Sequence, residues 1–238
     1  MSTDQEISGA EIILQALKDQ EVDTIFGYPG GAVLPIYDAL FGQNFLKHVL
    51  VRQEAGAVHA AEGYARSSGK VGVLLVTSGP GVTNVVTGLT DALMDSIPLV
   101  CISGQVPSHL IGTDAFQECD TTGITRPCTK HNYLVKDVSK LSETIHEAFE
   151  IARSGRPGPV LIDIPKDVQF AKSNYVKKSE VTFKSHRIKS GSKDINREFI
   201  ETLVDHIKKS KKPIFYVGGG CLNSGPLASQ ELMKLVEL

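Results

Sequence analysis

The sequence predicts an α/β protein: a doubly wound parallel sheet followed by the truncated start of a second α/β domain. Short runs of Val, Ile and Leu recur through residues 1–165, and stretches with a helical period separate them. Glycine-rich loops follow several of the runs. Strands that helices cover on both faces are apolar along their whole length, so runs of this kind indicate a parallel sheet.

Helices are predicted where apolar residues recur at a helical spacing or where alanine dominates. Ile12, Leu14 and Leu17 support the first helix, and an alanine-rich helix begins at Glu54. In this first part of the chain, helices are expected over residues 12–22, 33–40, 54–66, 82–95 and 141–154.

Strands are predicted where apolar runs stand between these helices. The run at 71–76 is a clear example, because Ser78-Gly79-Pro80-Gly81 breaks the chain directly after it. Strands are expected over residues 24–26, 48–51, 71–76, 98–103 and 160–164, and those at 48–51 and 98–103 are expected to be buried. No clear period runs from 104 to about 130, so no element is predicted there.

The second part of the chain has a different composition. Residues 166–190 are rich in Lys and Ser and weakly patterned, which is typical of a linker. A helix from Asp194, a strand at 213–217 and a helix from about Pro226 follow. We therefore predict a first domain over 1–168, a linker over 169–190, and the start of a second α/β domain over 191–238.

Composition and charge exclude several classes of protein. Acidic residues number 27 and basic residues 25, so a net charge of −2 provides no global basic field for nucleic acid. The four cysteines form no Cys-x-x-Cys pair, which fits a reducing compartment and predicts no metal site. The polar N-terminus is neither a signal nor a transit peptide, and no apolar stretch is long enough to span a membrane. These features predict a cytoplasmic protein.

Three strand ends carry the candidate site. Ligands in open α/β sheets bind beyond the carboxyl ends of the strands, where glycine lets the backbone approach a ligand closely. Gly27–Gly31, Arg52–Glu54 and Thr77–Gly81 follow successive strands. None matches a dinucleotide fingerprint or a P-loop, and each alone fits an ordinary βα turn. Glu54 is either a carboxylate that complements the helix dipole or a shielded carboxylate that faces a cofactor; spacing does not separate these two.

Longer blocks of sequence resemble a known family. Gly27–Ala32, Val51–Ala55, Ala60–Arg66 and Thr77–Asn84 look like the pyrimidine-binding domain of thiamine-diphosphate enzymes. Further blocks resemble the catalytic subunits of the acetolactate synthase (acetohydroxyacid synthase) family: Asp95–Val100, Ile111–Glu118, Thr129–Tyr133, Gly155–Pro159 and Pro165–Val168. The resemblance runs through about 8–170 and weakly through 213–221, and it implies that 191–238 begins a central FAD-binding-type domain.

The resemblance gives Glu54 a catalytic role. In that family the matching Glu hydrogen-bonds N1′ of the aminopyrimidine ring, which favours the imino tautomer that removes the thiazolium C2 proton. Such a carboxylate needs a shielded site that raises its proton affinity. Gln117 would reach the reacting end of the cofactor as a second catalytic residue. The resemblance implies that thiamine diphosphate contacts Pro29, Gly30, Glu54, Pro80, Gly81, Asn84, Gln117 and, with less support, Ser96.

The resemblance also implies a substrate channel and a second cofactor. The resemblance implies that Arg156 contacts FAD; the alternative to this contact is a role as an ordinary turn residue. For Ser96, a helix cap is as good an interpretation as a cofactor contact. The alternative to a channel role for Lys130 and Lys166 is that they are ordinary charged residues on the solvated surface. The predicted channel is lined by Gly31, Ala32, Val106, Pro107, Phe116, Lys130 and Lys166.

The implied reaction decarboxylates pyruvate and transfers the hydroxyethyl group to a second 2-ketoacid, pyruvate or 2-ketobutyrate, in branched-chain amino-acid biosynthesis. The implied partners are further catalytic subunits, in a homodimer or homotetramer, and a small regulatory subunit. The Mg²⁺ ligands of the family, a Gly-Asp-Gly followed by Asn-Asn, are absent from this sequence. We therefore expect the chain to be an inactive N-terminal fragment.

Two alternatives remain open at this point. The chain would be part of another thiamine-diphosphate enzyme, such as a catabolic acetolactate synthase, glyoxylate carboligase or pyruvate oxidase. The blocks at Ile111–Glu118 and Lys130–Tyr133 count against that alternative. Otherwise, it would be a stand-alone pyrimidine-binding module that pairs with a separate diphosphate-binding chain.

Overall fold

The computed structural model describes residues 6–182 and 196–237 and divides the chain into two compact units, Met1–Lys189 and Ser190–Leu238. The first unit is built on a six-stranded sheet with the strand order β3-β2-β4-β5-β7-β6. Each pair of neighbouring strands in this sheet is parallel. The six strands are β2 (Thr24–Gly27), β3 (Lys47–Leu50), β4 (Gly72–Val76), β5 (Leu99–Gln105), β6 (His131–Leu134) and β7 (Pro159–Pro165).

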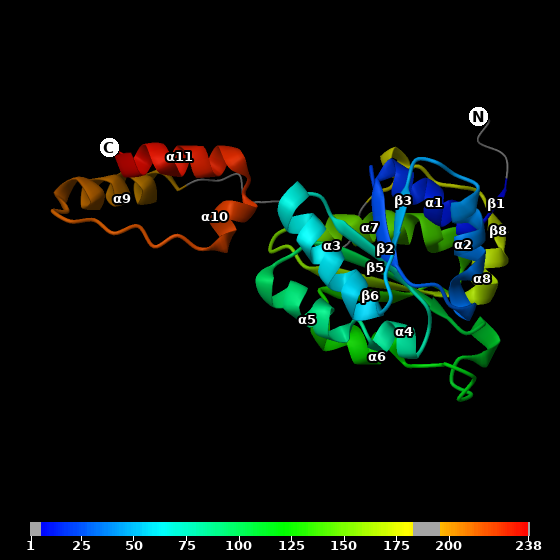
Figure 1. Cartoon of the computed structure of the whole chain (residues 1–238). Coiled ribbons are helices and arrows are strands. Elements are labelled where there is room, and N and C mark those ends of the chain that lie inside the picture. Colours follow the sequence, from blue (N-terminus) through cyan, green and yellow to red (C-terminus); the bar gives the residue numbers. More distant parts are fainter. Residues whose placement is uncertain (1–5, 183–195, 238) are drawn as a thin grey trace. The chain divides into compact units, whose positions relative to one another are not determined.

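Helices cover both faces of this sheet (Figure 1), which confirms the doubly wound α/β fold. The longer helices are α1 (Gly9–Asp19), α2 (Leu34–Phe41), α3 (Glu54–Ser68), α5 (Val86–Asp95) and α7 (Leu141–Arg153). Shorter helical segments are α4 (Pro80–Thr83), α6 (Thr121–Thr125) and α8 (Lys166–Phe170), with 3-10 turns at Gly31–Val33, Ser108–Leu110, Arg126–Cys128, Val138–Lys140 and Lys178–Glu180.

The alternation of side chains along the central strands explains the two layers. Val73 and Leu75 of β4 belong to the core that α1, α2 and α7 cover, whereas Leu74 and Val76 belong to the core beneath α3 and α5. Successive side chains of a strand point to opposite faces, so a strand with helices on both sides must be apolar at every position. All five residues of β4 are buried accordingly.

The order of the strands places a topological switch point between β2 and β4. After β2 the chain forms α2, which packs against one face of the sheet, and then β3, which pairs with one side of β2. It then returns through α3 on the opposite face and adds β4 on the other side of β2. The chain therefore leaves β2 and β4 toward opposite faces of the sheet, and a crevice for a ligand is expected at that point in such sheets.

The sequence predictions fail at the edges of the sheet. The strand predicted as buried at 48–51 is the edge strand β3, and the side chain of Leu50 is 63% exposed. The opposite edge strand, β6, was not predicted, because its four residues are only partly buried and carry no apolar run. The helix predicted over 82–95 is interrupted between α4 and α5, around Asn84 and Val85.

Residues beyond the predicted first domain also pack on this unit. The short strand β8 (Lys172–Ser173) pairs antiparallel with β1 (Ile7–Ser8). The Tyr175 hydroxyl donates a hydrogen bond to Asp19 Oδ2 at 2.8 Å, and the Ser142 hydroxyl donates to the Val176 carbonyl at 2.5 Å. Part of the predicted linker is thus ordered against the sheet's helices, while 183–190 lies outside the described residues. The domain boundaries at 168 and 190 remain a prediction.

The second unit contains α9 (Arg197–Lys209), α10 (Gly219–Asn223) and α11 (Pro226–Glu237) in its described part. Asn196 caps α9 by accepting a hydrogen bond from the Phe199 amide. The helix was predicted to begin at Asp194, which lies outside the described residues. Over 213–217 the predicted strand is wrong: the backbone forms no strand, and Ile214 is 92% exposed. A strand needs a neighbour to satisfy its backbone groups, and the described part of this unit provides none. None of the described helices is both long and apolar enough to cross a membrane.

Candidate functional site

The loops that follow β2 and β4 are joined at the switch point. The Tyr28 amide donates a hydrogen bond to the Leu75 carbonyl at 3.2 Å, and the Ala32 amide donates to Thr77 Oγ1 at 3.3 Å. A Cβ atom on Gly30 would lie only 2.5 Å from the Cβ of Thr77. Glycine at position 30 is therefore required for this close approach of the two loops.

Glu54 begins α3 at this carboxyl edge, and the residue is 9% exposed. Its Oε2 atom accepts a hydrogen bond of 2.9 Å from Nδ2 of Asn84, which follows α4. A Cβ atom on Gly81 would lie 3.7 Å from the Oε1 atom of Glu54 and 2.7 Å from Thr77 Cγ2. The carboxylate thus lies at a helix N-terminus and is also shielded and fixed by a neighbouring loop, while its contact with a cofactor remains a prediction.

The weakly patterned segment after β5 reaches the same place. Gly79 has φ +53° and ψ −113°, and a Cβ atom there would lie 2.4 Å from the carbonyl oxygen of Gln117. Gln117 itself has φ +56°, a backbone conformation that is uncommon outside glycine. The backbone of Gln117 therefore lies directly against the loop after β4. The neighbouring Phe116 is 87% exposed.

The carboxylate of Glu118 holds this segment in place. It accepts hydrogen bonds from the amides of Gly112 and Ala115, the second at 2.9 Å. The bond from the Gly112 amide is the main cause of a lowered pKa of Glu118. The turn that presents Phe116 and Gln117 is thus closed by an ionised side chain within the same segment.

Five of the predicted channel residues also gather at the carboxyl edge. A Cβ atom on Gly104, near the end of β5, would lie 2.6 Å from the carbonyl oxygen of Ala32, and the Gln169 side chain donates a hydrogen bond of 2.8 Å to that oxygen. The Ser108 amide donates to Oδ1 of Asp167 at 2.9 Å, which ties the turn after β5 to α8. These contacts bring together the segments that carry Gly31, Ala32, Val106, Pro107 and Lys166.

The structure does not bring Lys130 to this edge. Lys130 precedes β6, so it lies at the amino edge of the parallel sheet, opposite to Glu54. Its half-buried ammonium donates to the carbonyls of Ile151 and, at 2.7 Å, Ser154, at the end of α7. Burial lowers the pKa of Lys130 to about 8. This cation caps the C-terminus of α7, and its channel role beside Lys166 remains a prediction.

Ser96 and Arg156 also lie at the amino edge. Nε of Arg156 donates to Ser96 Oγ at 2.8 Å, and a terminal guanidinium nitrogen donates to the carbonyl of Met94 at 2.7 Å. Ser96 ends α5 in a left-handed conformation, with φ +61°. The helix-cap alternative for Ser96 is thus realised in the structure, and Arg156, expected as a turn residue, donates to carbonyls at the end of the same helix. The cofactor contacts of both residues remain a prediction.

The sequence analysis did not identify Asp163, which lies at the centre of a buried polar network. Asp163 Oδ1 accepts from the Ser103 hydroxyl at 2.7 Å, and Oδ2 accepts from Gln105 Nε2 at 2.8 Å. The same Gln105 nitrogen donates to the carbonyl of Cys119 at 2.9 Å. Burial raises the pKa of Asp163 to about 7. Asp163 lies inside a predicted apolar strand, and that strand gives no sign that one carboxylate faces polar partners on its neighbour.

The Asp163 network supports the site from beneath. Gln105 ends β5, and the chain returns to it at Cys119 after the turn that presents Gln117. Gln105 also uses its Oε1 to accept from the Val106 amide at 2.9 Å. Both ends of the 106–119 segment are thereby fixed to the sheet by one buried amide side chain, which constrains where Gln117 meets Gly79.

Comparisons with known proteins agree with this geometry. Residues 7–124 match the family described as "Thiamine pyrophosphate enzyme, N-terminal TPP binding domain". The chain is 52% identical over 237 residues to the chloroplastic acetolactate synthase of Arabidopsis thaliana, covering 99% of this chain and 34% of that protein. It is 50% identical over 234 residues to the isozyme 3 large subunit of acetolactate synthase from Escherichia coli, covering 97% and 40%.

A third relative is the mitochondrial catalytic subunit of acetolactate synthase from Saccharomyces cerevisiae, 51% identical over 238 residues, with 98% of this chain and 35% of that protein covered. The chain thus spans between a third and two fifths of the length of these relatives. The matched family domain contains Glu54, Asn84 and Gly81, which the fold brings together at the switch point. The chain therefore belongs to the acetolactate synthase family of thiamine pyrophosphate enzymes.

Proposed function

We propose that this chain provides the pyrimidine-binding half of an acetolactate synthase active site. The observation that supports this most strongly is the shielded Glu54 carboxylate, hydrogen-bonded to Asn84 and bordered by Gly81 at the switch point of the sheet. Ligands of open parallel sheets bind at this position. The proposed activity is the decarboxylation of pyruvate and the transfer of the resulting two-carbon group to a second 2-ketoacid.

The residues at the switch point fit the aminopyrimidine of thiamine diphosphate. Gly30 and Gly81 offer backbone without side chains, and Pro29 and Pro80 flank them with rigid backbone, which suits a flat ring. Glu54 supplies a carboxylate that is largely removed from water and therefore able to share a proton with a ring nitrogen. When bound, the cofactor would supply the carbanion chemistry, while the protein positions and polarises it.

Each remaining residue has a definite task in this proposal. Asn84 holds the Glu54 carboxylate in one orientation, so that its other oxygen faces the ring. Gln117, whose backbone is pinned against Gly79, would direct its amide toward the substrate. Phe116, Pro107 and Lys166 would border the entrance, where the ammonium of Lys166 attracts an anionic 2-ketoacid.

The other implied cofactors have weaker support in this chain. The Arg156 guanidinium already donates to Ser96 and to main-chain carbonyls, so an FAD contact would have to share those donors. Glu54 is used for the pyrimidine, and we assign no residue of this chain to Mg²⁺. FAD, Mg²⁺ and a role in branched-chain amino-acid biosynthesis are therefore proposals that rest on the resemblance.

Partners and location are proposals as well. The Escherichia coli and Corynebacterium glutamicum relatives are named large subunits, which supports a smaller partner subunit for this chain too. A homodimer or homotetramer of catalytic subunits is proposed on the resemblance alone. We propose the cytoplasm as its location, although two of the relatives are named for the chloroplast and the mitochondrion.

A chimera tests the proposed function. Residues 1–238 would replace the matching segment of the Escherichia coli isozyme 3 large subunit, to which they are 50% identical. We expect the purified chimera to form acetolactate from pyruvate when thiamine diphosphate and Mg²⁺ are added, as measured by the colorimetric acetoin assay. A folded, cofactor-binding chimera that decarboxylates pyruvate without forming acetolactate would instead favour another thiamine-diphosphate enzyme.

A mixing experiment addresses the stand-alone alternative. The 238-residue chain and the remaining C-terminal part of the same relative would be purified separately and combined. We expect no acetolactate from the mixture, because in that relative one longer polypeptide carries both parts. Activity from two separate chains would support a module that pairs with a second subunit.

A further inference from the structure

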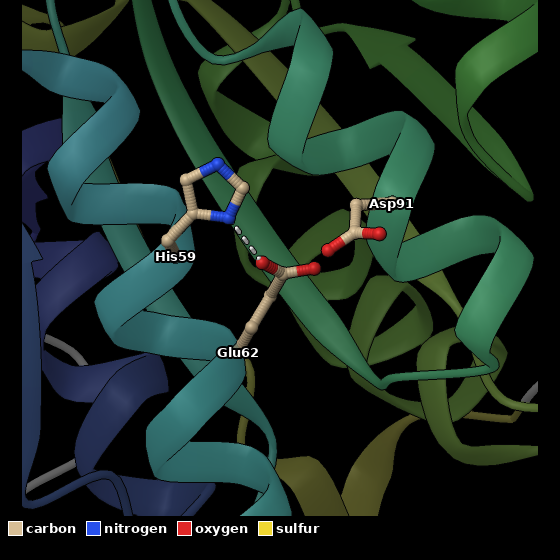
Figure 2. A group of neighbouring side chains, drawn as sticks. All are labelled: His59, Glu62 and Asp91. Carbon is tan, nitrogen blue, oxygen red and sulfur yellow. Dashed lines mark hydrogen bonds and ion pairs between the residues drawn. The ribbon is translucent and has the colours of Figure 1, made fainter.

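Three side chains of α3 and α5 form a cluster that the proposed function does not use. His59 and Glu62 are three residues apart on α3, so they project from the same face of that helix. Asp91 faces them from α5 (Figure 2), and one ligand atom of each residue lies within 4.8 Å of the others. The helices approach closely, because a Cβ atom on Gly88 would lie 2.2 Å from Val58 Cγ1.

Glu62 is the unusual member of this cluster. Its side chain is 6% exposed, and Oε2 lies 2.7 Å from Nδ1 of His59. The second oxygen, Oε1, is buried and has no hydrogen-bond partner among the described residues. Figure 2 shows this oxygen directed toward the Asp91 carboxylate. A buried carboxylate oxygen without a partner is costly, so its position calls for a ligand.

The surrounding charges do not satisfy this oxygen. Burial raises the pKa of Glu62, and the negative charge of Asp91 raises it further. Arg66 is the basic residue on α3 whose charge acts on Glu62, but its guanidinium forms an ion pair with Asp95. A cation placed between the two carboxylates would remove the repulsion and give Oε1 a partner at the same time.

The donor set defines the kind of cation. One imidazole nitrogen and two carboxylate oxygens suit zinc and its neighbours among the divalent transition metals, whereas Mg²⁺ and Ca²⁺ prefer oxygen alone. Two tetrahedral ligands of zinc at the usual bond lengths lie about 3.4 Å apart. The exposed side chains of His59 and Asp91 are free to close the remaining gap by small rotamer changes.

We propose that His59, Glu62 and Asp91 bind one divalent transition-metal ion of the zinc class, which links α3 to α5. A fourth position would be filled by water, as in sites with three protein ligands. α3 begins at Glu54, and α5 follows the loop that carries Asn84. The ion would therefore fix the spacing of the two helices behind the hydrogen bond between Glu54 and Asn84.

Metal binding to the 238-residue chain tests this proposal without any assay of activity. Calorimetric titration with Zn²⁺ should show one equivalent bound, and Co²⁺ should give a visible absorption band. That spectrum should lack the near-ultraviolet charge-transfer band that a cysteine ligand would produce. Glu62→Gln, His59→Ala and Asp91→Asn should each weaken Zn²⁺ binding by at least about 10-fold.

Two controls separate this site from adventitious binding. Asp38→Asn removes an exposed carboxylate from α2, and His109→Ala removes another exposed imidazole; both should leave Zn²⁺ binding unchanged. Asp91 is exposed, so its variant should fold even if a change at Glu62 does not. No binding of Zn²⁺ or Co²⁺ at millimolar metal, or wild-type affinity in Asp91→Asn, would overturn the proposal.

Discussion

Glu54→Gln should lower acetolactate formation by the chimera by at least about 10²-fold, the contribution of a positioned acid–base group. The glutamine amide keeps the size of the side chain and still accepts a hydrogen bond from Asn84 Nδ2 through its oxygen. It cannot share a proton with a ring nitrogen as a carboxylate does. The measurement is kcat for acetolactate formation at saturating pyruvate and thiamine diphosphate.

Glu143→Gln is the matched control for this prediction. Glu143 is also an acidic residue in the first turn of a helix, but its side chain is 47% exposed and lies on α7. We expect its kcat to equal that of the unmodified chimera, and we expect both variants to unfold at the same temperature as the parent. Full activity in Glu54→Gln would reduce Glu54 to a residue that only complements the helix dipole.

Asp163→Asn should make the first unit more stable at alkaline pH, by up to roughly 4 kcal/mol, because the folded pKa of about 7 lies some three units above the usual value. Well below pH 4 the carboxyl group is protonated in both folded and unfolded chains, so ionisation costs nothing. As the pH rises toward 7, the unfolded chain loses the proton and the folded chain retains it. The stability of the wild-type protein therefore falls across this range.

Asparagine should escape this penalty. Its amide oxygen can accept from Gln105 Nε2, and its amide nitrogen can donate to the Ser103 hydroxyl, as a protonated aspartic acid would. The measurement is the free energy of unfolding by urea at pH 4, 6 and 8 for wild type, Asp163→Asn and the exposed control Asp38→Asn. Parallel pH profiles for wild type and Asp163→Asn would show that the buried carboxyl group does not titrate as proposed.

The central sheet was predictable because burial on both faces leaves a pattern in the sequence. β4 and β5 are apolar at most positions, and helices of clear period flank them. β6 carries no apolar run and was therefore missed, whereas the short apolar run at 48–51 predicted a buried strand that the fold places at an edge of the sheet. The strand predicted at 213–217 has the pattern but no partner in the described residues.

The candidate site was predictable in part, for a related reason. Gly30, Glu54 and Gly81 follow parallel strands, so the fold class alone places them at one edge. Lys130 and Arg156 belong to similarly suggestive blocks but precede strands, and strand direction sends them to the opposite edge. Asp163 and the cluster of His59, Glu62 and Asp91 depend on contacts between elements far apart in the chain, which no spacing in the sequence reveals.

The account rests on thiamine diphosphate binding at the carboxyl edge between β2 and β4, and NMR tests this most directly. Thiamine diphosphate and Mg²⁺ would be titrated into the ¹⁵N-labelled 238-residue chain while backbone amide shifts are recorded. We predict saturable shifts at Gly30, Glu54 and Gly81, weak affinity, and unchanged amides at Lys130 and Arg156 of the amino edge. Shifts confined to the amino edge, or no shifts at millimolar cofactor, would contradict the account.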